Sequence, residues 1–271
     1  MLAAKSLDMV RADRQISIMG ILNLTEDSYF APSRYNLAIL DSEADIIDIG
    51  AISTRPGAAD VPEEEEWRRL EPVLRSYTGT KPISIDTVRA SVVERCCETL
   101  GRPVIVNDIS AGEDDPEMLP TVARLGLVYI AMHKRGNPAT MQSLCEYGNV
   151  CEDVLSYFKD FAMKAEELGV RDWILDPGFG FAKTVAQNFE LLDSLEEFQQ
   201  LGRKVLIGIS RKSFMYKTLA VGPEAALTAT QTMHIAALER GADILRVHDV
   251  DAARQTVKLY RSLKGVDYSS I

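Results

Sequence analysis

The chain has 271 residues, of which 46% are hydrophobic and 26% are charged. This composition excludes a disordered chain, and no apolar run reaches the roughly 18 residues that a membrane-spanning helix needs. Its 30 Lys and Arg residues against 40 Asp and Glu residues give a net charge of −10, which repels a phosphate backbone. Because we find no local basic stripe that would override this charge, we expect neither a nucleic-acid nor a membrane partner.

The four cysteines include the adjacent pair Cys96 and Cys97, and none has the CxxC spacing of a zinc or redox site. Reduced thiols are therefore the simpler interpretation. Charged residues interrupt the N-terminal segment before its first long apolar run, so this segment lacks the hydrophobic region of a secretory signal. We expect a cytoplasmic protein.

Short apolar runs rich in Ile and Val recur along the chain. Each run is continuous rather than alternating, which is typical of parallel strands that are covered on both faces. The pattern predicts eight strands. In chain order they are Ile16–Leu22, Ile46–Ile49, Ile83–Ile85, Val104–Val106, Leu127–Met132, Trp173–Leu175, Val205–Ile209 and Ile244–Val247.

Segments with helical spacing lie between most of these runs, among them Asp153–Leu168, Val185–Leu201 and Thr228–Arg240. A glycine suited to a left-handed helix end follows each of the three, at Gly169, Gly202 and Gly241. Eight strand-and-helix units match a (β/α)8 barrel, whereas a doubly wound sheet more often has about five or six strands. We therefore predict an α/β fold, a single-domain (β/α)8 TIM barrel over residues 16–265, with an N-terminal extension over residues 1–15.

Polar residues lie at the ends of the predicted strands. In order they are Asn23, Asp48, Asp86, Asn107 with Asp108, His133, Asp176, Ser210 with Arg211 and Lys212, and Arg246 with His248. At any single position, the simpler interpretation is that a polar residue ends a strand. In such a barrel, however, the carboxyl ends of all strands meet at one mouth, where the active site lies. The sequence therefore predicts a polar site at this mouth.

Four of these residues suggest what the site binds. They would present two carboxylates, one amide and one ammonium, on Asp86, Asp176, Asn107 and Lys212. Buried charges are costly unless they pair with one another or bind a polar ligand. A flat heterocycle with an N–H edge and a carbonyl edge would satisfy them, and a 2-amino-4-oxo pyrimidine ring has this arrangement.

Arg246 and His248 lie at the end of the eighth predicted strand, which barrel closure brings beside Asn23 at the end of the first. We interpret these three residues as an anion pocket, because phosphate sites in such barrels favour the last strands. A structural ion pair of Arg246 and a core imidazole of His248 with its hydrogen bonds satisfied are the alternatives. Arg55, in the polar segment 53–57, also suits an anion or a carboxylate, although an exposed loop arginine is the simpler interpretation.

Four further features have local interpretations. Gly178 and Gly180 directly follow a predicted strand, which indicates a loop whose backbone closely approaches a neighbour. We expect His234 to be a packing residue and the run Glu63–Glu66 to be a solvated first helical turn. His133 is open to either a structural or a functional interpretation.

Taken together, these segments resemble the dihydropteroate synthases, the pterin-binding (β/α)8 enzymes of folate biosynthesis. The match covers nearly the whole chain in the expected order, which makes it more specific than any single motif. It rests on MGILNLTEDS at Met19–Ser28, DIGAISTRPGA at Asp48–Ala58, SIDT at Ser84–Thr87, NDIS at Asn107–Ser110, MH at Met132–His133, NPATMQ at Asn137–Gln142, LDPGFGF and KT within Leu175–Thr184, SRKS at Ser210–Ser213 and RVHDV at Arg246–Val250.

The resemblance implies condensation of 6-hydroxymethyl-7,8-dihydropterin pyrophosphate with p-aminobenzoate, giving 7,8-dihydropteroate and pyrophosphate. It also implies Mg2+ on the leaving group, a sulfonamide target and a homodimer. An aromatic amine is neutral at pH 7 and already nucleophilic, so the attack needs no general base. We therefore expect a dissociative, SN1-like substitution in which catalysis is mostly electrostatic and positional.

The resemblance further implies a role for each matching residue. The pterin site would comprise Asp86, Asn107, Met132, Asp176, Phe181 and Lys212. The pyrophosphate site would comprise Asn23, Arg246 and His248, with Asn23 also a metal ligand. The p-aminobenzoate site would comprise Thr54, Arg55, Phe181, Lys212 and Ser213. The catalytic residues would be Asp86, Arg246 and Lys212, with Asp86 stabilising the cationic pterin.

The first crossover departs from the family pattern. Family members usually have a Pro in place of Glu26 and an Asp-Gly-Gly-like turn in place of 31–33. Only the segment Ala31–Glu43 precedes the lead-in to the second strand, which leaves room for a short helix around Asn36–Ser42. We therefore predict a shortened first βα crossover.

Two alternatives follow from this departure. The first is a non-catalytic pterin-binding paralogue, which would have no need of the anion-binding segments around Arg55, Lys212 and Arg246. The second is a methyltransferase domain that binds methyltetrahydrofolate in the same kind of barrel. Such a domain would have little use for Arg55 and Ser213.

Overall fold

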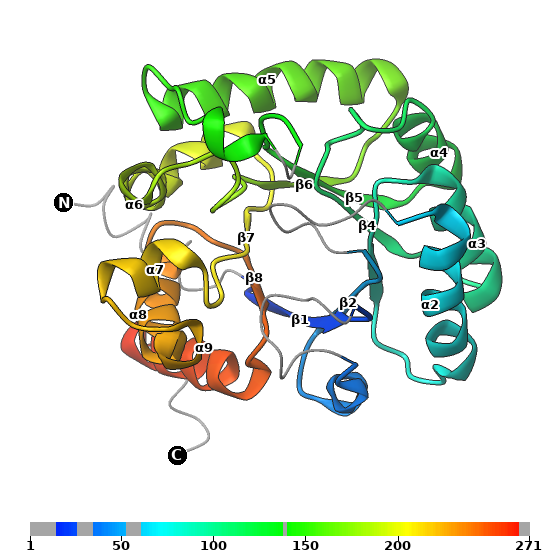
Figure 1. Cartoon of the computed structure of the whole chain (residues 1–271), viewed down its shortest axis with the longest axis horizontal. Helices are drawn as coiled ribbons and strands as arrows, with labels where there is room; N and C mark the ends of the chain where they lie inside the picture. Colours follow the sequence, from blue (N-terminus) through cyan, green and yellow to red (C-terminus); the bar gives the residue numbers. More distant parts are fainter. Residues whose placement is uncertain (1–14, 26–34, 53–60, 138–139, 266–271) are drawn as a thin grey trace.

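The computed structural model describes residues 15–25, 35–52, 61–137 and 140–265. Within these residues, eight parallel strands form one sheet in the order β6-β5-β4-β3-β2-β1-β8-β7, and helices surround it (Figure 1). The strands are β1 Ser17–Asn23, β2 Ile46–Gly50, β3 Ile83–Asp86, β4 Ile105–Asp108, β5 Val128–Met132, β6 Trp173–Asp176, β7 Leu206–Ile207 and β8 Ile244–Val247. The predicted (β/α)8 barrel is confirmed.

The ring of strands closes between β6 and β7. An isolated parallel bridge pairs Leu175 with Val205, and the Leu175 N–H donates a hydrogen bond to the Lys204 carbonyl at 3.0 Å. β7 is shorter than the predicted Val205–Ile209, because only two of its residues pair with β8. Within the described chain, β6 and β7 are therefore joined by an isolated bridge and not by a paired ladder.

Helices follow the strands along the described chain. The α-helices are α2 Glu63–Ser76, α3 Ala90–Leu100, α4 Met118–Leu125, α5 Val150–Leu168, α6 Val185–Asp193, α7 Ser213–Thr218, α8 Leu227–Glu239 and α9 Val250–Leu263. The 3-10 helices are η2 Leu37–Asp41, η3 Met141–Ser143, η4 Leu195–Leu201 and η5 Pro223–Ala226. The predicted helix Val185–Leu201 is thus wrong as one element, because it divides at Ser194 into α6 and η4. No helix in the described part of the chain is long and apolar enough to cross a membrane.

The first crossover is short, as predicted, and its helix η2 is a 3-10 helix of five residues. Gly20 of β1 explains how so short an element can cover the barrel. A Cβ at Gly20 would lie 3.0 Å from Ile39 of η2, 3.0 Å from Val250 and 3.1 Å from Ala44. The missing side chain therefore lets η2 and α9 pack directly on the backbone of β1.

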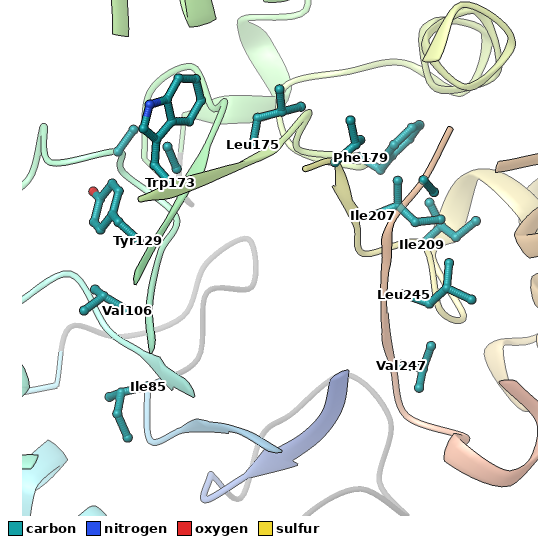
Figure 2. Packing of buried hydrophobic residues seen from close by; sticks show 14 of the residues in the cluster. Ile85, Val106, Tyr129, Trp173, Leu175, Phe179, Ile207, Ile209, Leu245 and Val247 are labelled. Carbon is teal, nitrogen blue, oxygen red and sulfur yellow. The ribbon is translucent and has the colours of Figure 1, made fainter. Parts of the chain in front are cut away.

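Strand side chains alternate between the two faces of the barrel wall. Outward-facing residues such as Ile85, Val106 and Leu245 pack in the large cluster between the strands and the helices (Figure 2). Inside the barrel lies a smaller apolar cluster of Met19, Ile130, Ile174, Leu206 and Ile244. Because alternation has a period of two, Asp176 and Arg246 occupy the next inward positions after Ile174 and Ile244, toward the carboxyl ends of β6 and β8.

Candidate active site

A guanidinium between two carboxylates forms the centre of the mouth. Arg246 Nε and Nη2 each lie 2.6 Å from Asp48 Oδ2, and Nη2 also lies 2.6 Å from Asp86 Oδ2. The amide of Asn107 donates to the same Asp48 oxygen at 3.1 Å. Residues from β2, β3, β4 and β8 are thereby joined in one network, although they are distant in sequence.

The charges in this network shift one another. Burial alone lowers the pKa of Arg246, but Asp48 and Asp86 outweigh it and raise this pKa, so the guanidinium stays charged. Burial raises the pKa of Asp86 to about 7, with Arg246 opposing the shift and Asp48 adding to it. Asp86 therefore changes its charge near neutral pH. Arg246 forms a structural ion pair, which was the alternative interpretation to a role in an anion pocket.

A second pair of charges stands on β6 and after β7. Asp176 is buried, and its Oδ1 accepts a hydrogen bond from the Gly178 N–H at 2.8 Å. Burial raises the pKa of Asp176, and the ammonium of Lys212 partly offsets this shift. Burial likewise lowers the pKa of Lys212 to about 8, with Asp176 opposing. Lys212 also donates to the Phe179 carbonyl.

The two groups of charges lie next to each other. A Cβ atom on Gly208 would lie 3.9 Å from Asp176 Oδ2 and 4.0 Å from Arg246 Cδ, so both side chains border the same position. Met132 pairs in register with Asp176 and is buried at the end of β5. The structure therefore brings the predicted pterin-site residues from separate strands to one mouth, as the sequence indicated.

The loop after β6 folds tightly, as its glycines indicate. Gly178 has a φ of +72°, and a Cβ there would lie 1.9 Å from the His133 carbonyl oxygen. Lys183 stabilises the loop, since its Nζ donates to the Gly178 carbonyl at 3.0 Å and to the Phe181 carbonyl at 3.1 Å. It also lies 3.0 Å from His133 Nδ1.

Within the described residues, Lys183 and His133 have structural roles. Both are buried, and burial lowers the pKa of Lys183 to about 7 and that of His133 well below its usual value. His133 also packs edge-on against Tyr157 at 4.9 Å between ring centroids. Of the two interpretations of His133, the structure favours the structural one.

The predicted p-aminobenzoate residues are only partly within the described residues. The Phe181 ring centroid lies 4.5 Å from Lys212 Nζ, so the ring covers the ammonium on one side. Ser213 is half-buried at the first position of α7. Thr54 and Arg55 lie outside the residues that the structure describes.

The third predicted group lies where β1 and β8 pair. Asn23 ends β1, and its carbonyl accepts a hydrogen bond from the Tyr35 N–H at 2.8 Å. His248 Nδ1 lies 3.0 Å from Ser210 Oγ, and burial together with Arg246 lowers its pKa to about 3. The imidazole is therefore neutral and can offer an anion an N–H group but no positive charge.

Two other sequence interpretations have clear outcomes. The expectation of a solvated turn at Glu63–Glu66 is wrong for Glu66, which is fully buried and pairs with Arg89 at 2.5 Å. An isolated buried carboxylate is costly, so the pair with Arg89 explains its presence there. His234 is a buried packing residue, as expected, and burial lowers its pKa to about 4.

Sequence reasoning gave no role to three residues that the structure places around the site. Asp48 holds Arg246, Lys183 supports the glycine loop, and Arg211 has a φ of +54° directly before Lys212. Arg211 also forms a bidentate pair with Asp249 at 2.8 and 2.9 Å. Asp48 and Arg211 were among the polar strand-end residues of the sequence, and strand alternation places Asp48 on the inward face of β2, two residues before Gly50.

Comparisons with known proteins agree with this geometry. The chain matches the family described as pterin binding enzyme over residues 19–248. It is 40% identical over 260 residues to the dihydropteroate synthase of Synechocystis sp., covering 91% of this chain and 89% of that protein.

Solved structures give the same result. A Yersinia pestis dihydropteroate synthase with a bound sulfonamide drug is 32% identical and superimposes with a TM-score of 0.86 over 94% of this chain and 96% of that one. The Xanthomonas albilineans enzyme with 4-aminobenzoic acid is 33% identical, with a TM-score of 0.83 over 94% and 95%. On the family match, the sequence identity and the shared barrel, this chain belongs to the pterin-binding enzyme family.

Proposed function

We propose that the chain is a dihydropteroate synthase, which condenses 6-hydroxymethyl-7,8-dihydropterin pyrophosphate with p-aminobenzoate. The observation that carries this proposal is the convergence of Asp86, Asn107, Asp176 and Lys212 around Arg246 at one mouth. This set of groups combines what a pterin ring needs with a cation beside it for the diphosphate. The relatives named above, which the chain matches over most of its length, support it.

The pterin ring would lie between the two pairs of charges. Asp176 would accept the ring N–H and the 2-amino group side by side, and Lys212 would donate to the carbonyl edge. Asn107 has one amide N–H committed to Asp48, so its other N–H and its oxygen are the groups that would meet the ring. Met132 and Phe181 would supply apolar contacts.

The leaving diphosphate would bind where β1 and β8 meet. Arg246 would supply the positive charge, and neutral His248 would supply an N–H donor. Within the described chain, Arg246 forms its hydrogen bonds through Nε and Nη2. We therefore assign its third nitrogen, Nη1, to the diphosphate. Such preorganised donors stabilise charge that develops on a leaving group.

Bond cleavage would leave positive charge on the pterin methylene carbon. The carboxylate of Asp86 would stabilise this charge, while Arg246 stabilises the departing diphosphate. The neutral aromatic amine of p-aminobenzoate would then attack without a general base. We therefore propose a dissociative substitution in which positioning and electrostatics provide most of the rate.

The second substrate would approach over the loops after β6 and β7. Phe181, Lys212 and Ser213 would contribute to its site, and we also propose Thr54 and Arg55 as ligands of this substrate. Arg55 suits the benzoate carboxylate, because a guanidinium binds a carboxylate with two parallel hydrogen bonds. A relative bound to 4-aminobenzoic acid supports this proposal.

Mg2+ fits the donors of this site only together with the diphosphate. The described residues contain no cluster of three or more His, Cys, Asp or Glu side chains able to hold a metal. Mg2+ commonly takes one or two protein ligands, several waters and substrate phosphates, so the amide oxygen of Asn23 beside a diphosphate suits it. The ion would neutralise charge on the leaving group.

We also propose a homodimer that acts in the cytoplasm, where its four free thiols would remain reduced. Light scattering tests the first point, because a dimer has twice the chain mass of 30.0 kDa.

One assay tests the proposed activity. Pyrophosphate release is measured with the pterin substrate in the presence and absence of p-aminobenzoate, and the product is identified by mass spectrometry. We expect dihydropteroate only when both substrates are present. Pterin binding without release of pyrophosphate would indicate the non-catalytic paralogue, and transfer of a methyl group from methyltetrahydrofolate would indicate the methyltransferase.

A further inference from the structure

Asp48 is the buried residue at the centre of the site to which the mechanism above gives no chemical step. Its side chain is fully buried on the inward face of β2. All of its hydrogen bonds go to one oxygen, Oδ2, which accepts from Arg246 and from Asn107. Oδ1 has no partner among the described residues, and neither has the hydroxyl of Ser84, which lies opposite in register on β3.

A buried carboxylate with one unpaired oxygen is costly, so its presence needs a reason. Packing does not provide one, because an apolar residue would fill the same space without loss of solvation. The reason must lie in what the charge does to its neighbours. Its nearest charged neighbour is Arg246, and the next along the network is Asp86.

The geometry shows a competition between two carboxylates for one guanidinium. Asp48 takes both Nε and Nη2 of Arg246, whereas Asp86 contacts only Nη2. Nε and its neighbouring Nη form the side of a guanidinium that binds carboxylates with two bonds. Because Asp48 occupies that side, Asp86 is left with a single contact and keeps one oxygen clear of the guanidinium.

We propose that Asp48 is a positioning residue that holds Arg246 away from a two-bond pair with Asp86, so that the Asp86 carboxylate stays available to the cationic pterin. This inference rests on the proposed function. It adds a residue that acts through Arg246 and Asp86 and does not itself touch the substrate. It also explains why one cation is shared by two carboxylates, since the net negative charge of the three groups faces the carbon that becomes positive.

The test is Asp48→Asn, which keeps the shape of the side chain and removes its charge. We expect kcat, taken at the plateau of the pH profile, to fall roughly tenfold or more, because a charge-assisted contact is lost and Asp86 becomes fully paired. KM for the pterin substrate should stay the same or fall, because less negative charge faces the diphosphate. A merely structural role would not produce this split between kcat and KM.

The acidic limb of the pH profile provides a second readout. Asp48 is one of the groups that raise the pKa of Asp86, so its removal should move the limb to lower pH. The other charged groups facing Asp86 are unchanged in this variant, and they are Arg246, Glu66, Asp108 and Lys212. In an Asp86→Asn background, Asp48→Asn should have little further effect on kcat, because it acts through the missing carboxylate.

Asp243→Asn is the matched control. Asp243 is also a buried aspartate, but it precedes β8 at the opposite end of the barrel, where it accepts from the Val205 N–H at 2.9 Å. It should lower the unfolding temperature and leave kcat and KM unchanged. Asp48→Ser, which removes the charge with a smaller side chain, must change kcat in the same direction as Asp48→Asn.

The outcomes separate the two proposals. Absence of dihydropteroate from the unaltered enzyme refutes the proposed function. Normal turnover with an unchanged plateau kcat in both Asp48 variants refutes the inference alone. The inference is equally refuted by a raised KM at constant kcat, or by effects of Asp48→Asn and Asp86→Asn that simply add.

Discussion

Replacing Asp86 with Asn isolates the charge that we assign to the cationic pterin. Arg246 keeps both of its contacts with Asp48 in this variant, so the guanidinium should remain in place. An amide in the same position preserves the shape of the side chain. The substitution therefore removes one negative charge with little change in the framework around it.

The size of the effect follows from electrostatics. A unit charge about 6 Å from the developing cation, at an effective dielectric constant of about 20, contributes roughly 3 kcal/mol. This energy corresponds to about a hundredfold in rate. Removal of one preorganised donor from an oxyanion hole has an effect of similar size. We expect the loss in kcat, with no rise in KM for the pterin substrate.

The measurement is pyrophosphate release at saturating p-aminobenzoate, with Asp243→Asn as the control for loss of a buried carboxylate. Thermal unfolding of each variant shows whether the barrel is intact. Unchanged turnover in an intact Asp86→Asn enzyme would contradict the reasoning. A rise in KM without a change in kcat would show that Asp86 contributes to substrate binding and not to the transition state.

Three further predictions concern acid–base behaviour, the loop after β6 and a buried ion pair. The pH profile of kcat/KM should be bell-shaped. Protonation of Asp86 below about pH 7 removes its negative charge, and deprotonation of Lys212 above about pH 8 removes its positive charge. Steady-state rates from pH 5 to 10 test this, and a flat profile would contradict it. Gly178→Ala should abolish soluble, folded protein, since its Cβ would lie 1.9 Å from the His133 carbonyl oxygen; circular dichroism of the variant tests this, and a native spectrum would count against the close approach. Glu66→Ala should lower the free energy of unfolding by about 2 kcal/mol, because the half-buried Arg89 loses its buried counter-charge. Urea denaturation measures this, and a change below about 0.5 kcal/mol would mean that the pair contributes nothing.

The barrel was predictable because its strands are buried on both faces. Continuous apolar runs such as Val104–Val106 and Trp173–Leu175 differ clearly from the intervening helices, and the glycines at helix ends mark their boundaries. The strand β7 was overestimated at its end, because Ile209 is apolar and buried without belonging to the paired segment, and Val205 forms only an isolated bridge with Leu175. Burial and strand pairing usually coincide, and here they differ.

The candidate site was predictable as a set of residues but not as a network. Strand-end positions identified Asp86, Asp176 and Arg246, because barrel geometry gathers all such ends. The sequence alone did not indicate that Arg246 lies between two carboxylates, since that depends on the level of each side chain inside the barrel. The burial of Glu66 was missed for a related reason, because its partner Arg89 lies on a different helix-and-strand unit.

The weak junction between β6 and β7 has a consequence for how this protein responds to its ligand. One isolated bridge pairs the two strands, and Asp176 ends β6 on one side of it while Lys212 follows β7 on the other. A ligand bound by both side chains would link β6 to the segment that follows β7. Binding of a ligand at the mouth would therefore stabilise the barrel at the junction of β6 and β7.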